Sequence, residues 1–290
     1  MDKPKFQYLI SVEDDVNTSI FDIILTNNNN DVIYVKPDTI RIYPEWSQPY
    51  ILDSLSAENI RISRYIITLP NNDLIFTDID SNFFVIKWNS EKEKYNNNYS
   101  TFFKLKTGFF ISNLLYHPDN IIVFCASGSL CYLKLNEEYS AISIHKVNLP
   151  NIVGKLIDID KSGNFYYAEM NRDIFVMEGI TSENPNVINM HQKLPLYHTR
   201  SIKLFEDIVV TLYGKSSYIE SLIRISNNFD EEDNENDYIL PTRCISTDDC
   251  RGNIATMCRY QNDKILLFDY IEHSVWELNL GHQIKSAIDC

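Results

Sequence analysis

The sequence predicts an all-β fold, a single closed β-propeller of six blades. Three observations lead to this fold class. Aromatic residues make up 12% of the 290 residues, with 18 Tyr and 15 Phe, and these residue types favour strands. Short apolar runs separated by polar turns recur along the whole chain. No stretch keeps the 3.6-residue apolar period that an amphipathic helix requires.

The recurring unit contains an apolar strand, a polar turn, a second apolar strand, a short break and a third strand. Six such segments begin at Phe21, Ser63, Ile111, Gly154, Thr199 and Ala255. The turn residues that precede the second strands lie 42, 47, 44, 43 and 56 residues apart by subtraction, and they are Asp31, Asp73, Asn120, Asn164, Asp207 and Asp263. Propeller blades commonly have about 40–45 residues and four strands, so each segment is interpreted as one blade.

A fourth, outer strand is expected in each blade, although its half-exposed sequence is less apolar. The candidates are residues 49–55, 101–106, 141–147, 186–193 and 238–245, with 283–288 in the sixth blade. Residues 6–12 have strand character but no inner strands before them. Their pairing with the last blade would close the ring and remove exposed strand edges, so we expect the N-terminal strand to close the propeller.

The number of blades follows from chain length. After Asp263, 27 residues remain, and 31 residues lead up to and include Asp31, which leaves room for one blade with its closing strand and not for two. Six blades are therefore favoured over seven. A β-sandwich or a solenoid is the alternative, because short strands alone also suit those folds. We interpret residues 1–290 as one domain, with residues 227–237 (NNFDEEDNEND) as an acidic surface-loop insertion in blade five.

Composition limits the function classes. The formal net charge of −14 is opposite to that of a general nucleic-acid binder, so we expect no direct nucleic acid. There is no apolar leader at the N-terminus and no apolar run long enough to span a bilayer, so we expect no membrane association and a cytoplasmic or nuclear location. The six cysteines form no C-x-x-C pair, which is typical of reduced thiols rather than of a zinc site.

The repeat resembles the WD40-like β-propellers over nearly the whole chain, at the level of the fold. Trp46, Trp88 and Trp276 end or sit within third strands, near the position of the WD40 tryptophan, although the Gly-His and Trp-Asp dipeptides of that family are missing. Strand order and N-terminal closure also resemble the RCC1-type propellers, whose repeats contain more glycine than the eight present here. The resemblance implies a scaffold that presents loops to other proteins.

Motifs for chemistry are missing from the sequence. It contains no phosphate-binding glycine loop, no G-x-S-x-G and no H-E-x-x-H, so we predict a protein that is not an enzyme and needs no cofactor. Asp158 and Asp160 share one face of an expected inner strand, and His191 and His198 lie seven residues apart. The two carboxylates suit either a polar channel lining or a metal site. A six-bladed hydrolase or lactonase with such a channel site therefore stays as the alternative function.

Basic residues recur where the first strands of the blades begin. In a propeller these positions surround one rim of the central channel. A positive rim on an acidic body would attract an acidic segment of a partner, so we predict a protein-interaction scaffold, a subunit or regulator of a larger intracellular complex. The candidate rim residues are Arg61, Arg64, Lys155, Arg200, Lys203 and Arg251.

Overall fold

The computed structural model describes residues 5–12, 22–45, 47–52, 61–105, 110–194, 199–205, 208–214, 221–226, 238–241, 254–261, 263–270 and 273–280. All regular secondary structure in these ranges is β-strand, and no helix occurs within them. The predicted all-β class is therefore confirmed. Consistent with it, none of these residues belongs to a helix long and apolar enough to cross a membrane.

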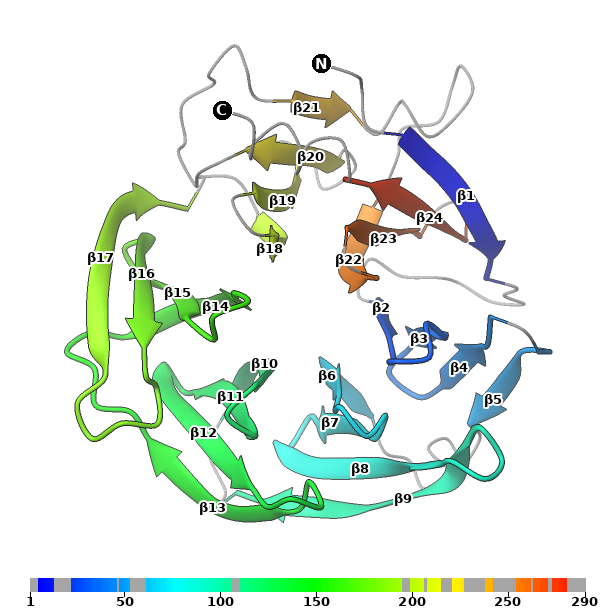
Figure 1. Cartoon of the computed structure of the whole chain (residues 1–290), viewed down its shortest axis with the longest axis horizontal. Helices are drawn as coiled ribbons and strands as arrows, with labels where there is room; N and C mark the ends of the chain where they lie inside the picture. Colours follow the sequence, from blue (N-terminus) through cyan, green and yellow to red (C-terminus); the bar gives the residue numbers. More distant parts are fainter. Residues whose placement is uncertain are drawn as a thin grey trace. The chain divides into compact units, whose positions relative to one another are not determined.

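The strands form four-stranded antiparallel sheets, most of them built from consecutive strands (Figure 1). Five sheets take four successive strands each, and the sixth takes β22–β24 together with β1 from the N-terminus. The first two sheets contain β2 (Ile23–Thr26), β3 (Val32–Val35), β4 (Ile40–Tyr43) and β5 (Tyr50–Leu52), then β6 (Ile62–Thr68), β7 (Leu74–Asp78), β8 (Asn82–Asn89) and β9 (Lys94–Lys104). The next two contain β10 (Ile111–His117), β11 (Ile121–Ala126), β12 (Ser129–Leu135) and β13 (Ala141–Lys146), then β14 (Val153–Ile159), β15 (Phe165–Glu169), β16 (Asp173–Glu178) and β17 (Asn186–Lys193).

The remaining strands complete the fifth and sixth sheets. They are β18 (Thr199–Phe205), β19 (Ile208–Gly214), β20 (Ser221–Ser226), β21 (Tyr238–Pro241), β22 (Ile254–Tyr260), β23 (Lys264–Asp269), β24 (Ser274–Asn279) and β1 (Lys5–Ser11). The predicted pairing of the N-terminal strand with the last blade is observed, because β1 pairs antiparallel with β24 from Lys5 opposite Asn279 to Ser11 opposite Ser274.

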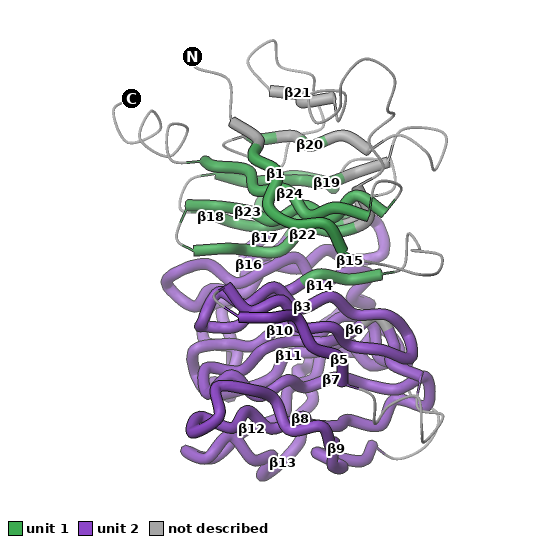
Figure 2. The backbone as a smooth tube through the Cα atoms, turned by 90° about the vertical axis from the view of Figure 1, so that its right-hand side faces the viewer, with its two compact units in different colours: residues 1–24, 172–174, 190–290 green, residues 25–171, 175–189 purple. Residues whose placement is uncertain are grey.

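The chain divides into two compact units, coloured separately in Figure 2. Unit 2 comprises residues 25–171 and 175–189, and unit 1 comprises residues 1–24, 172–174 and 190–290. Within unit 2, the first strands β6, β10 and β14 lie side by side (Figure 1). Within unit 1, the first strands β18 and β22 are neighbours in the same way.

The core of unit 2 lies between successive sheets, and β11 shows how the sequence builds it. Its residues IIVFCA are all buried. Ile122 and Phe124 pack toward the sheet of β6–β9, whereas Ile121 and Val123 pack toward the sheet of β14–β17. Because side chains alternate between the two faces of a strand, a strand buried on both faces is a continuous apolar run.

A β-bulge recurs near the beginning of the first strands. The pairing register shifts between Ser112 and Leu114 in β10, and between Val153 and Lys155 in β14. β18 and β22 shift at the corresponding place, after Thr199 and Ile254. A bulge places an extra residue in one strand and redirects the side chains around it. The first strands therefore share a special geometry at the place where the sequence shows recurrent basic residues.

Several sequence predictions have a direct outcome. The outer strand predicted at 186–193 is observed as β17, and Trp88 and Trp276 lie in the third strands β8 and β24. The outer strand predicted at 101–106 begins earlier than expected, at Lys94. Trp46, the acidic insertion 227–237 and the outer strand predicted at 283–288 lie outside the described residues.

Candidate functional site

The first strands of the sheets in unit 2 all begin at the same edge of those sheets. In an antiparallel four-stranded sheet, this edge also carries the link between the second and third strands and the end of the fourth strand. The register of the third sheet illustrates it, with Ile111 opposite Ala126 and Ala126 opposite Ser129. We call this edge of unit 2 the loop face, and the opposite edge, with the other strand links, the turn face.

Hydrogen bonds join neighbouring sheets along the loop face. The strands β6, β10 and β14 each begin with a residue whose backbone N–H donates a hydrogen bond to the preceding sheet. The acceptor lies in the link between the second and third strands of that sheet. Ile62 N donates to Pro37 O at 2.6 Å, and Val153 N donates to Gly128 O at 2.9 Å. Ile111 N donates to Ser81 Oγ at 3.3 Å. These bonds connect the loops of successive sheets, because each joins a backbone donor at the start of one sheet to an acceptor in the preceding sheet.

Four large apolar side chains project from the loop face. The exposed fractions are 79% for Phe110, 71% for Met170, 63% for Ile79 and 61% for Ile152. Phe110 and Ile152 immediately precede β10 and β14, whereas Ile79 and Met170 lie in links between second and third strands. We call these four residues the apolar arc. Their side chains are the four most exposed large apolar ones among the residues that the structure describes.

The backbone beneath the apolar arc is well braced. Phe110 N donates to Ser127 Oγ at 3.3 Å, and Ser127 N donates to Phe110 O at 2.9 Å. Met170 N donates to Ile152 O at 3.2 Å. Gly128 has a φ of +80°, and a methyl group added there would lie only 2.6 Å from Ile152 Cγ2. The arc is thus presented by hydrogen-bonded loops that leave little space between them.

The predicted basic residues fall on both units. Arg61 is exposed just before β6, and Lys155 is half-buried directly after the bulge of β14, so both lie on the loop face of unit 2. Lys203 is half-buried within β18 of unit 1. Arg64 and Arg200 belong to β6 and β18, but their side chains, like the whole of Arg251, lie outside the described residues.

Two further cations on the loop face were missed by the sequence analysis. Lys104 and Lys146 are exposed at the ends of the outer strands β9 and β13, opposite Asn82 and Cys131. Both lysines lie in the second half of an outer strand expected from the sequence, at 101–106 and 141–147, and that position was the signal. The apolar arc was also missed, and its signal was a large apolar residue inside a turn sequence, such as Ile79 in TDIDSN. A single apolar residue adds nothing to a periodic pattern, which explains the omission.

Carboxylates gather instead on the turn face. Its exposed acidic residues are Glu45, Glu91, Glu93, Asp119, Glu137, Glu138, Glu178 and Glu183, and its exposed basic residues are Lys87, Lys92, Lys94, Lys134 and Lys161. On the loop face the exposed cations of unit 2 are Arg61, Lys104 and Lys146, and the exposed carboxylates are Asp38 and Asp80. The balance of charge therefore differs between the two edges of the described part of unit 2, with the positive excess on the loop face.

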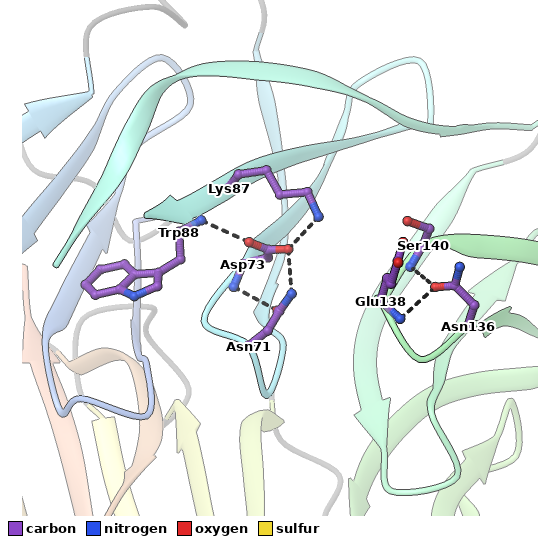
Figure 3. Close-up of polar contacts among 7 residues, drawn as sticks. All are labelled: Asn71, Asp73, Lys87, Trp88, Asn136, Glu138 and Ser140. Carbon is purple, nitrogen blue, oxygen red and sulfur yellow. Dashed lines mark hydrogen bonds and ion pairs between the residues drawn. The ribbon is translucent and has the colours of Figure 1, made fainter. Parts of the chain in front are cut away.

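Side chains fold the links of the turn face. The Asn136 side-chain oxygen accepts the backbone N–H groups of Glu138 and Ser140 at 3.0 and 2.8 Å (Figure 3). Asn27 and Asp160 accept two backbone N–H groups in the same pattern. This Asx-turn geometry explains why Asn and Asp punctuate the repeat. Hydrogen bonds within each turn therefore fix the backbone conformation of these links of the turn face.

The buried carboxylate of Asp73 organises one of these links, as Figure 3 shows. Its Oδ2 accepts hydrogen bonds from Lys87 Nζ at 2.7 Å and Asn71 Nδ2 at 2.8 Å. Its Oδ1 accepts the backbone N–H of Trp88 at 2.9 Å. The side chain is 3% exposed, so these donors stabilise a charge that water barely reaches. Asp73 is best interpreted as a structural residue.

The paired carboxylates Asp158 and Asp160 have different surroundings. Asp158 is buried within β14, whereas Asp160 follows the strand and caps the next turn. Asp160 Oδ2 accepts Asn164 Nδ2 at 2.9 Å and the Tyr166 hydroxyl at 3.3 Å, while its Oδ1 accepts backbone N–H groups. Within the described residues, no group of three or more His, Cys, Asp or Glu side chains is arranged to hold a metal ion.

The described histidines have separate roles. His117 is buried, its Nδ1 accepts Asp119 N at 3.0 Å, and its Nε2 lies 2.6 Å from Gly163 O. Because Nδ1 is an acceptor, Nε2 carries the proton and donates to the carbonyl of the neighbouring sheet. His191 is exposed in β17, and its sequence partner His198 lies outside the described residues. His117 therefore links two sheets of unit 2.

Searches by sequence returned no match: no family model fits the chain, and no curated protein matches it. Solved structures match in fold. A chain of the mitotic checkpoint complex aligns with a TM-score of 0.59 and 8% identity over 96% of this chain and 94% of that chain. The RRP9 WD40 repeats align with a TM-score of 0.54 and 12% identity, over 89% and 93% of the two chains.

An enzyme also shares the architecture. Catalytically inactive virginiamycin B lyase from Staphylococcus aureus, solved with quinupristin, aligns with a TM-score of 0.53 and 13% identity over 89% of this chain and 79% of that chain. Identities this low establish the fold alone. The chain has the fold of the WD40- and NHL-type β-propellers, and the WD40-like resemblance predicted from the repeat is thereby confirmed at the level of the fold.

Proposed function

We propose that this protein is a non-catalytic protein-interaction scaffold, a subunit or regulator of a larger complex in the cytoplasm or nucleus. The observation that carries the proposal is the concentration of exposed apolar side chains on the loop face. Isolated apolar residues are normal on a protein surface, but the four most exposed ones among the described residues stand on hydrogen-bonded loops at one edge of unit 2. Similarity to a chain of the mitotic checkpoint complex supports the same class of function.

The partner would be a protein that offers an acidic segment to the basic residues of the loop face. Arg61, Lys104 and Lys146 are exposed there, on a chain whose formal net charge is −14. Positive charge at one edge of an otherwise acidic protein orients an approaching acidic partner, because it attracts that partner to this edge only. The proposed rim also includes Arg64, Arg200 and Arg251.

The architecture proposed for the scaffold is one closed ring of six blades in a single domain. In this proposal the five sheets of β2–β21 are five blades, and the four-stranded sheet of β22–β24 with β1 is the sixth. The antiparallel pairing of β1 with β24 supports closure by the N-terminal strand, which covers an edge that would otherwise be open to another chain. In such a ring the first strands surround a central channel.

Co-purification tests the scaffold function. A tagged full-length chain, expressed at its native level in its own cells, is expected to carry at least one other protein in a fixed molar ratio after quantitative mass spectrometry. The association is expected to weaken as salt is raised, since exposed charges contribute to it. Recovery of the chain alone, across several mild extraction conditions, would contradict the proposed function.

A second candidate function is a propeller enzyme with a channel-lining carboxylate or metal site. The similarity to virginiamycin B lyase structures favours keeping it. Asp158, buried in the first strand β14, would be its carboxylate, because Asp160 is engaged in a turn. Metal analysis of the purified protein separates the two candidates: a stoichiometric divalent cation, lost in an Asp158→Asn variant that still folds, would favour the enzyme.

A further inference from the structure

We propose that the apolar arc binds a short segment of another protein in which large apolar side chains are flanked by carboxylates. This inference rests on the proposed scaffold function and names the chemistry of its partner. The first observation behind it is the exposure of the four apolar side chains. Phe110, Met170, Ile79 and Ile152 keep 61–79% of their surface in water, although burial of large apolar side chains is favourable. A partner that covered them would gain from that burial.

Backbone hydrogen bonds order the loops that carry the apolar arc before any partner binds. Phe110 exchanges two hydrogen bonds with Ser127, and Ile152 accepts one from Met170. Ile62, Ile111 and Val153 tie the loops of neighbouring sheets to one another. A surface that is already ordered loses little conformational freedom when it is covered, which leaves more of the contact energy for affinity.

The spacing along the arc fits a linear segment. Ile79, Phe110 and Ile152 belong to three successive sheets, and facing sheets pack about 10 Å apart. Extended chain advances about 3.3 Å per residue, so apolar side chains about three residues apart would reach successive positions. A segment of about eight residues would span the three sheets.

The charged residues of the loop face indicate which residue types should flank the apolar side chains of the bound segment. Arg61, Lys104 and Lys146 are exposed at the same edge, and Lys155, three residues after Ile152, is half-buried. Of the acidic residues there, Asp78 accepts backbone N–H groups of its own turn, and Glu169 accepts two hydrogen bonds from Asn151 at 2.9 and 3.0 Å. The exposed cations thus outnumber the exposed carboxylates Asp38 and Asp80. Carboxylates beside the apolar side chains of a partner would find complementary charge.

A second copy of this chain fits the surface less well. Pairing of two copies through the same patch would bring two surfaces with an excess of positive charge together, because a twofold interface uses the same patch of both copies. Like charges brought together across an interface disfavour association. The occupant is therefore a different protein segment, with acidic flanks.

A displayed library of random 16-residue peptides tests the inference on the full-length protein. The selected peptides are expected to contain two or more large apolar residues with neighbouring Asp or Glu. Their binding, measured with synthetic peptides by fluorescence anisotropy, is expected to fall at least tenfold with the Phe110→Ser/Met170→Ser variant. The control is Ile142→Ser/Ile188→Ser, which changes exposed apolar residues of the outer strands β13 and β17 and is expected to bind normally.

In the peptide experiment, the inference would be overturned by no enrichment, by enrichment of basic peptides, or by equal loss of binding with the control variant. Sedimentation of the wild type as a dimer that the arc variant abolishes would also overturn it, since the occupant would then be a second copy. The scaffold function itself fails separately. If the arc variant still recovers the native partner at the wild-type ratio, the inference is wrong while the scaffold function stands.

Discussion

At the scale of single residues, the buried carboxylate of Asp73 offers a test of how the turn face is held together. The Asp73→Ala variant is expected to lower the free energy of unfolding by about 2–4 kcal/mol, because Trp88 N and Lys87 Nζ lose a charged, buried acceptor. Urea unfolding measures the change. The exposed Asp80→Ala variant is the control, with an expected change within about 0.5 kcal/mol. Equal effects of the two variants would contradict the structural role of Asp73.

Two glycines with positive φ separate stability from binding. Gly128 has φ +80° and Gly163 has φ +81°, so alanine at either position is expected to cost about 1–2 kcal/mol of folding stability. Only at Gly128 would the new methyl collide with Ile152 of the apolar arc; at Gly163 the nearest atom, in the His117 ring, is 3.5 Å away.

Gly128→Ala is therefore expected to weaken partner binding, and Gly163→Ala is expected to leave it unchanged. A titration of the co-purifying partner with both variants, at matched temperature below their melting points, makes the comparison. Equal affinities of the two variants would remove Ile152 from the binding surface.

The sequence predicts residues of the core better than residues of the candidate site. Ile122 and Phe124 can be predicted as core residues because they belong to a continuous apolar run. A strand that is buried on both faces has no polar position. Phe110 and Met170 are single apolar residues in links between strands, and Met170 meets Ile152 only through the pairing of β14 with β15, which residue types do not reveal. Arg61 and Lys155 could be named because they recur at strand starts, which a repeat makes visible.

At the scale of strands, β9 shows why outer elements are hard to predict. It begins at Lys94 and includes the polar residues YNNNYS, which precede the outer strand expected at 101–106. Its side chains are mostly exposed, so no apolar alternation marks it. Backbone pairing with β8 makes the strand, from Asn82 opposite Lys104 to Asn89 opposite Lys94. Such an edge strand is determined by hydrogen bonds that the residue types do not reveal.

The N-terminal strand β1 is expected to stabilise the sheet that it completes. Deletion of residues 1–12 removes its pairing with β24, the edge-on contact between Tyr8 and Trp276 at 5.5 Å, and the bond from Val12 N to His273 O. A loss of about 2 kcal/mol corresponds to a melting temperature lower by roughly 4–8 °C.

Differential scanning calorimetry measures the effect of this deletion, and Tyr8→Ala is expected to produce a smaller shift than the deletion. An unchanged melting temperature after the deletion would show that β1 contributes nothing to the stability of its sheet.

At the scale of the whole molecule, buried acids set the response to alkaline pH. Burial raises the pKa of the Cys258 thiol from 9.0 to about 12, and it raises the pKa of the Tyr116 phenol from 10.0 to about 12. Burial also raises the pKa values of Tyr50, Tyr166 and Cys131. Between about pH 9 and pH 12 the unfolded chain has therefore released protons that the folded chain keeps.

Because the unfolded state then binds fewer protons, the free energy of unfolding is expected to fall as pH rises through this window and to be independent of these groups below about pH 9. Urea unfolding at one-unit steps from pH 7 to pH 11 measures the trend. The Tyr116→Phe variant cannot ionise at that position, so its decline is expected to be shallower. A stability that stays level up to pH 11 would contradict the burial of these groups.

The proposed binding function belongs to the whole molecule, because in the proposal it depends on charge at one edge of an acidic body. The Arg61→Glu/Lys155→Glu variant reverses two cations of the loop face, and Lys92→Glu/Lys134→Glu reverses two cations of the turn face with the same change in net charge. Melting curves of both variants verify folding, and Lys155→Gln replaces Lys155→Glu if the half-buried position does not tolerate reversal.

The most direct test of the scaffold account is the dissociation constant of the co-purified partner for these two variants, measured at about 50 mM and 300 mM salt. The account predicts binding weakened at least tenfold by the loop-face reversal, with a larger loss at low salt, and nearly unchanged by the turn-face reversal. Equal affinity of the folded loop-face variant and the wild type at both salt concentrations would contradict it.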